Sequence, residues 1–289
     1  MRGKWNTLVG AGALTVSLLC RATSAEAQAG QQDQPPSQQQ PPADKDKQPN
    51  PAPLSMDNAP AASPEEDSAS KAVQQATDPN KRIQLAEEFL QKYPQSRYRG
   101  AMYQALVSGY FATQQVPKML DAGEKEVALN PNDAPVLAVM GQALARTYNA
   151  KAPDAAKQLD KAEQYSKRAI EITPTLTKPE NLTDEAFSNA KNDTLVMAHS
   201  GLGLVYIRRQ KFSEAIPELE QSVKADSHPD PDPVNYYLLG VADKQTSHFE
   251  AAAAAFSKCA TVQSTLQAAC KSGAEDAKKQ GSTQLSAPN

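Results

Sequence analysis

Apolar residues recur at steps of three and four along most of the chain, from about residue 63 to residue 278. This spacing places them on one face of an α-helix. The clearest helix of this kind has its apolar face at Phe212, Ala215, Ile216, Leu219 and Val223. A polar segment at 208–211 separates it from an earlier apolar run at 202–207. The pattern predicts an all-α protein made of helix pairs, because no segment shows the two-residue alternation typical of a strand.

Glycine stands inside these helical runs at a repeated position. Gly203 follows Leu202 with no turn residue nearby, and Gly240 follows Leu239 at a spacing of 37 residues. A glycine inside a helix costs roughly 1 kcal/mol relative to alanine, so we expect a neighbouring helix to pack closely against it. Because one helix pair cannot cover its own apolar face, a repeat of this length indicates a stack of pairs.

The repeated units resemble the tetratricopeptide repeat, whose pattern places Leu-Gly and Tyr on a first helix and Ala, an aromatic residue and Pro around a second. The best-matching copy contains Leu202, Gly203, Tyr206, Phe212 and Ala215. The copy that follows it contains Leu239, Gly240, Phe249, Ala252 and Phe256. In that second copy Asp243 replaces the tyrosine. The resemblance covers residues 63–264 and implies a right-handed α-solenoid of about five antiparallel helix hairpins.

Three earlier copies are degenerate. One of them is defined by Gly141, Ala162, Ala169 and Pro174. It carries an insertion near residues 149–158, and the two copies before it, which end at Pro131 and Pro94, lack the glycine. After the last hairpin, we expect a helix at 265–280 to cover the end of the stack, followed by a disordered tail at 281–289.

The first 27 residues are typical of a secretory signal peptide. Arg2 and Lys4 precede an apolar stretch at 8–19, and residues 25–27 read Ala-Glu-Ala, which matches a cleavage site. The apolar stretch is short for a membrane span. We therefore expect cleavage after this site, no integral membrane span afterwards, and export to the periplasm or the extracellular space, with or without attachment to the cell envelope. An uncleaved anchor and lipidation at Cys20 are the alternatives.

Residues 28–62 are rich in Gln and Pro and nearly free of aliphatic side chains. Such a segment cannot bury enough apolar surface to offset the entropy lost on ordering. We therefore expect a disordered linker that acts as a spacer. A Pro-rich recognition segment is the alternative, but the basic flanking residues that such a motif would carry are missing.

Two cysteines follow the predicted signal peptide, Cys259 and Cys270. Export implies an oxidising compartment, in which a pair of thiols tends to form a disulfide. Cys259 stands at a small-residue position of the last repeat, and Cys270 lies on the helix expected to pack there. We predict a disulfide between them. Two buried free thiols are the alternative.

The sequence offers little for catalysis. The three histidines, His199, His228 and His248, have no metal-ligand spacing, and no nucleophile, base and acid fall in a pattern that predicts a triad. The formal net charge is -3 without a basic run, which argues against nucleic-acid binding. We predict a protein that is not an enzyme and that uses no metal or cofactor.

The resemblance implies instead that first helices line a concave groove that binds a protein or peptide. The groove positions carried over by register are Gln104, Ser108, Phe111, Gln142, Arg146, Ser200, Leu204, Arg208, Tyr237, Val241 and Lys244. Aromatic and basic residues together suit an extended or helical peptide. Each of these residues is equally compatible with a solvated helix face.

These observations predict a non-enzymatic scaffold for protein-protein interactions in the bacterial cell envelope. An accessory factor for assembly or transport in an outer-membrane or secretion complex is the first alternative. A non-catalytic subunit of an envelope enzyme is the second.

Overall fold

The computed structural model describes residues 62–180 and 182–285. This part of the chain forms helices and no strand, so the predicted all-α class is confirmed. The helices are α1 (Pro64–Gln75), α2 (Pro79–Lys92), α3 (Arg99–Ala112), α4 (Val116–Leu129), α5 (Ala134–Arg146), α6 (Ala155–Ile172), the short 3-10 helix η2 (Thr173–Thr175), α7 (Asp184–Arg208), α8 (Phe212–Ala225), α9 (Pro233–Gln245), α10 (Phe249–Thr261) and α11 (Gln267–Leu285). The predicted signal peptide, the linker up to residue 61 and the last four residues lie outside the described residues.

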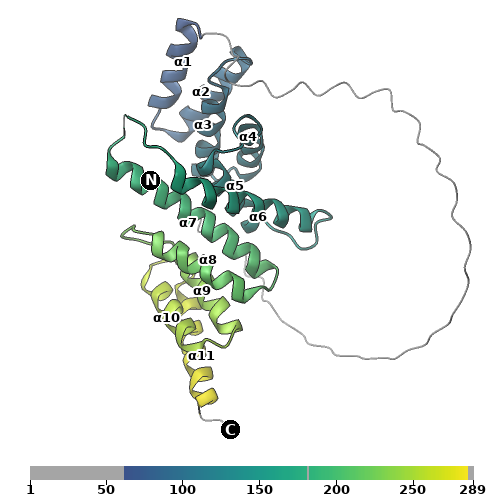
Figure 1. Ribbon diagram of the computed structural model, residues 1–289, viewed down its shortest axis with the longest axis vertical. Helices are drawn as coiled ribbons and strands as arrows, with labels where there is room; N and C mark the ends of the chain where they lie inside the picture. The colour runs from purple at the N-terminus through teal and green to yellow at the C-terminus, as the bar shows by residue number, and fades with distance from the viewer. Residues whose placement is uncertain (1–61, 181, 286–289) are drawn as a thin grey trace, which may run out of the picture.

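The helices stack as consecutive hairpins. α3 packs on α4, α5 on α6, α7 on α8 and α9 on α10, and the second helix of each pair also contacts the first helix of the next. Figure 1 shows the stack running from α1 at one end to α11 at the other. This is the stack of helix pairs that the repeated pattern predicts.

Three of the hairpins turn in the same way. Gln114, Gln210 and Ser247 each follow the C-cap of a first helix and have φ of 60°, 60° and 62°. In each turn, the two residues after the C-cap donate their backbone N–H groups to carbonyls in the last turn of that helix. An example is the bond from the Lys211 N–H to the Tyr206 carbonyl, at 2.9 Å. This is the Schellman arrangement, which usually has glycine at the left-handed position. Its repetition gives the hairpins at α3–α4, α7–α8 and α9–α10 the same geometry.

The helix glycines have the packing role that the sequence indicates. A Cβ added to Gly203 would lie 2.6 Å from Leu219 Cγ of α8, and one added to Gly240 would lie 2.8 Å from Phe256 Cδ1 of α10. Both distances are too short for a real side chain. Glycine therefore lets α7 and α9 each pack closely on the second helix of its own hairpin.

The C-terminal end of the stack is held covalently. Cys259 of α10 and Cys270 of α11 form a disulfide, with their Cα atoms 5.7 Å apart, as predicted. Both cysteines are fully buried. The helix expected at 265–280 is α11, which packs along α10. It continues to Leu285, so residues 281–285 are helical where a disordered tail was expected.

Candidate partner-binding surface

Three of the predicted groove residues are interior contacts. Gln142, Ser200 and Leu204 are 8%, 1% and 6% exposed. The cause is the close crossing of α5 and α7, because a Cβ added to Gly201 would lie 2.9 Å from the backbone nitrogen of Gln142. Ser200 Oγ also donates to Asn235 Oδ1 of α9 at 2.6 Å. These side chains are covered by other helices and cannot contact a partner in this structure.

The N-terminus of α9 lies over the same region. Asp232, the N-cap residue of α9, accepts from the Val234 N–H at 3.0 Å and forms an ion pair with Arg146 at the end of α5, with Nη2 and Oδ2 3.0 Å apart. Arg208 is exposed, and its guanidinium lies 5.9 Å from the ring centroid of Tyr148. Arg146 was expected to line an open groove formed by the first helices, but it is an ion-pair partner that bridges α5 and α9.

The three predicted residues of α3 are more accessible. Gln104 and Ser108 are exposed and Phe111 is half-buried. Gln104 donates from Nε2 to the Asp133 carboxylate of α5, and Ser108 Oγ donates to the Ala105 carbonyl at 3.0 Å. These three side chains line neither of the two pockets described below.

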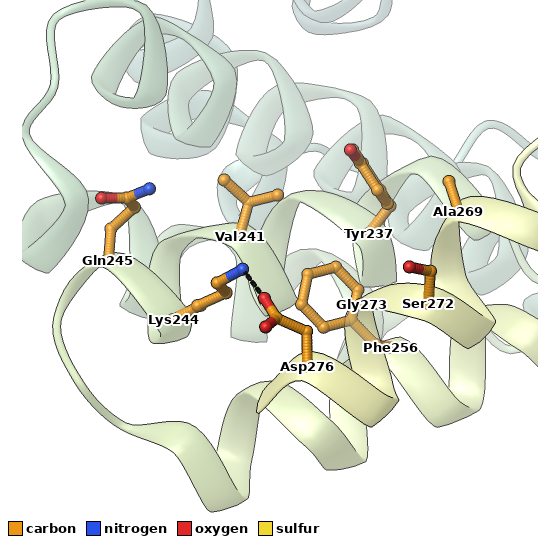
Figure 2. Close-up of a pocket in the computed structure, with 9 residues that line it drawn as sticks. All are labelled: Tyr237, Val241, Lys244, Gln245, Phe256, Ala269, Ser272, Gly273 and Asp276. Carbon is orange, nitrogen blue, oxygen red and sulfur yellow. Dashed lines mark hydrogen bonds and ion pairs between the residues drawn. The ribbon is translucent and has the colours of Figure 1, made fainter. Parts of the chain in front are cut away.

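The structure brings the last three predicted residues together. Tyr237, Val241 and Lys244 of α9 line an open pocket of about 480 Å³ between α9, α10 and α11. Figure 2 shows these residues with the rest of the lining. The rest of the lining is Gln245, Phe256, Ala269, Ser272, Gly273 and Asp276. The pocket lies where α11 contributes small residues to the lining and makes few contacts with α9.

The pocket combines aromatic side chains with a charged pair. The rings of Tyr237 and Phe256 meet edge to face with centroids 5.7 Å apart. Lys244 forms an ion pair with Asp276 of α11, and the two groups point toward each other in Figure 2. Hydrogen bonds from Lys244 and then Gln280 hold the pKa of Asp276 below its usual value, so this carboxyl group is ionised at neutral pH. Such a site suits an apolar side chain carried by a polar peptide backbone.

Sequence reasoning missed the part that α11 plays in this pocket. Ala269, Ser272, Gly273 and Asp276 come from a helix that was expected only to cover the end of the stack. The predicted disulfide was the available signal, since it fixes Cys270 against α10 and so turns the neighbouring residues of α11 toward α9. A second open pocket, of about 510 Å³ between α2, α3 and α4, was also not foreseen.

The described residues hold no group of three or more His, Cys, Asp or Glu side chains placed to bind a metal ion. His199 Nδ1 lies 2.7 Å from Glu218 Oε2, and His228 Nε2 lies 2.6 Å from Asp193 Oδ1. His248 Nδ1 lies 3.7 Å from Asp243 Oδ1, so each of the three histidines lies beside a carboxylate. No helix in the described part of the chain is both long and apolar enough to span a bilayer.

Comparison with known proteins gives a likeness in structure alone. No family model matches the sequence, and no curated protein matches it. Twelve chains of solved structures match the fold. One is the crystal structure of TTC0263, a thermophilic TPR protein in Thermus thermophilus, at 16% sequence identity and a TM-score of 0.45, with 76% of this chain and 98% of that chain covered.

Proposed function

We propose that this protein is a non-enzymatic scaffold that binds a peptide segment of a partner protein at the C-terminal end of its helical stack. The observation that carries the proposal is the convergence of Tyr237, Val241 and Lys244 on one open pocket with α11. The proposed surface leaves out Gln142, Ser200 and Leu204, which are buried.

The pocket has the chemistry for a side-chain anchor. Its aromatic wall, Tyr237 and Phe256, removes an apolar side chain from water at roughly 25 cal/mol per Å² of buried apolar area. The Lys244–Asp276 pair offers one charge of each sign to the polar groups of a peptide backbone. A volume of about 480 Å³ is at the small end of ligand pockets, so one or two partner residues would fill it, with further contacts outside.

We further propose that the protein acts after export, in the periplasm or another extracytoplasmic compartment. Support comes from the signal-peptide pattern of residues 1–27 and from the Cys259–Cys270 disulfide, since structural disulfides persist in oxidising compartments. N-terminal sequencing of protein from the envelope fraction tests this. A chain that still begins at Met1 there would contradict cleavage.

Photo-crosslinking tests the binding site. Ser272 lines the pocket, whereas Lys271 lies on the same helix, is also exposed and does not line it. A photoreactive amino acid at position 272 should crosslink a discrete partner in living cells, and the same group at 271 should not. Mass spectrometry of the crosslinked product identifies the partner. Components of an outer-membrane or secretion complex would favour the assembly-factor alternative.

A blocking substitution gives the matched control. Ala269→Arg fills the pocket mouth, and Ala268→Arg places the same side chain one position away. The crosslink formed from a group at position 245 should fall at least tenfold with Ala269→Arg and persist with Ala268→Arg. Equal crosslinking in both variants would rule out the pocket as the binding site.

A further inference from the structure

Two carboxyl groups are buried together where three helices of the N-terminal half meet. Glu126 of α4 is 1% exposed, and Asp133, the N-cap of α5, is 6% exposed. The two carboxyl groups are within hydrogen-bonding reach of each other. On its other side, Glu126 packs against α3, since a Cβ added to Gly100 would lie 3.2 Å from Glu126 Oε2. The pair is therefore a contact shared by α3, α4 and α5.

Among the described residues, the groups that hydrogen-bond to this pair carry no positive charge. Gln104 of α3 donates to Asp133 Oδ2, and the Val136 N–H donates to Asp133 Oδ1 at 3.1 Å. The side chain of Asn130, in the turn between α4 and α5, bonds to Glu126. The carboxyl groups thus lack the cation that normally accompanies a buried charge.

The cations on the surrounding elements are engaged elsewhere. Lys125 of α4 pairs with Asp121, with Nζ and Oδ2 2.7 Å apart. Arg99 of α3 donates from Nη1 to the Pro94 carbonyl at 3.3 Å. Arg168 of α6 reaches the α4–α5 turn, where it donates to Asn132 Oδ1 at 2.7 Å, and it also pairs with Glu171. The charged group that acts on Glu126 is Asp133.

Burial and the neighbouring Asp133 carboxylate raise the pKa of Glu126 from its ordinary 4.5 to about 7. Two adjacent carboxylates in a site shielded from water disfavour double ionisation. Glu126 Oε2 has no hydrogen-bond partner among the described residues, so the ionised form gains nothing there to offset its lost hydration. A proton on one carboxyl group turns the repulsive contact into a hydrogen bond to the other.

We propose that Glu126 and Asp133 share one proton in the folded protein, and that loss of this proton loosens the α3–α4–α5 junction, which is thus a pH-sensitive hinge in the stack. The place suits a hinge, because α4 and α5 pack together less extensively than α5 does with α6 or α7. Loosening also frees the Gln104 amide, which Asp133 holds. The inference is independent of the proposed function, because the peptide pocket lies at the opposite end of the stack (Figure 1).

The direction of the pH effect follows from proton binding. The unfolded chain loses the Glu126 proton near pH 4.5 and the folded chain near pH 7. Between these values the folded state binds more protons, so stability is full below about pH 4.5 and falls as pH rises to 7. A carboxyl group whose pKa is lowered in the folded state by a nearby cation would instead make the protein more stable as pH rises.

Thermal unfolding of the full chain from pH 5 to pH 8.5 tests the inference. Glu126→Gln keeps the shape and the hydrogen bond to Asp133 but cannot ionise. At pH 8 it should raise the Tm by about 4 °C or more over wild type, and this difference should shrink as the pH is lowered to 5. Asp121→Asn is the control, since it removes an exposed carboxylate from the same helix, and its pH profile should run parallel to that of wild type.

Hydrogen exchange separates a hinge from a general loss of stability. At pH 8, amides at 99–146 should exchange several times faster in wild type than in Glu126→Gln, while amides at 233–285 exchange equally in both. If the Gln variant folds poorly, Asp133→Asn serves instead, since asparagine also caps a helix and removes the second charge. Equal Tm profiles for wild type and whichever variant folds, or faster exchange along the whole stack, would overturn the hinge.

Discussion

The crossing of α5 and α7 and the gap between α9 and α11 are built from the same kind of residue with opposite results. At the first, Gly201 lets α7 pack closely on α5. A Cβ added to Gly201 would lie 2.9 Å from the backbone nitrogen of Gln142. At the second, Ala269, Ser272 and Gly273 of α11 line an open pocket, and Gly273 faces the Phe256 ring of α10. α5 and α7 are thus in close contact, whereas α9 and α11 leave an open pocket beside them.

The difference between the two places lies in what holds α7 and what holds α11. α7 packs on α6 and α8 as well as on α5, but it contains no cysteine and so has no covalent link to another helix. Burial of apolar surface draws it onto α5. α11 is fixed to α10 through the Cys259–Cys270 disulfide, so its small residues cannot close the distance to α9. A small side chain therefore favours close packing only where the backbone can move toward its neighbour.

Removal of the disulfide should have the largest effect on this contrast. The bridge closes a loop with a sequence separation of 11, for which the loop-entropy picture gives about 2–4 kcal/mol. Cys259→Ser with Cys270→Ser should therefore lower the free energy of unfolding by about that amount, and amides of α11 should lose most of their exchange protection. Denaturant unfolding and hydrogen exchange measure the two effects.

The matching control is a reductant. Wild type in dithiothreitol after full unfolding and refolding should behave as the double variant does, whereas brief exposure of the folded protein should have no effect, because both cysteines are fully buried. A double variant with unchanged protection in α11 would show that packing alone positions this helix, and the explanation of the pocket would be lost.

A pair of glycine substitutions should have the next largest effect. Gly201→Ala meets the α5 backbone, 2.9 Å from the Gln142 nitrogen, and overpacking of this kind costs about 1–3 kcal/mol. Gly273→Ala meets Cγ and both Cδ atoms of the Phe256 side chain of α10 at 3.0–3.1 Å, so this ring must shift by a few tenths of an ångström, and the variant gains up to about 1 kcal/mol from helix propensity.

The two variants are each other's control in urea unfolding. Gly201→Ala should be clearly destabilised, and Gly273→Ala should lie within about 1 kcal/mol of wild type. Equal losses would mean that α11 packs on α10 at Gly273 as tightly as α7 packs on α5 at Gly201.

The fold was predictable from the sequence because its causes are local and repeated. Gly203 and Gly240 stand 37 residues apart in the same helical setting, and each meets the second helix of its own hairpin. The site was only partly predictable, because groove residues carried over by register assume a uniform distance between successive first helices. Ser200 is buried since Gly201 shortens that distance, and Asp276 was missed since nothing local places α11 beside Lys244.

The bridge from α5 to α9 gives the smallest expected effect. Arg146 and Asp232 are 18% and 33% exposed at the side chain, and a pair so placed contributes about 0.5–1 kcal/mol. Asp232→Asn isolates this contribution, because asparagine caps a helix as well as aspartate does, so the bond from the Val234 N–H is kept. The free energy of unfolding should fall by about this amount at low salt, and the difference should shrink in 1 M NaCl, where the Debye length is about 3 Å.

Asp121→Asn is the control. It removes a solvent-exposed carboxylate that pairs with Lys125, and it should leave the contact between α5 and α9 intact. Faster exchange at the start of α9 in Asp232→Asn but not in Asp121→Asn would show that the ion pair helps to keep this part of the stack closed, whereas equal exchange would leave the closure to Gly201 and the buried contact of Ser200 with Asn235.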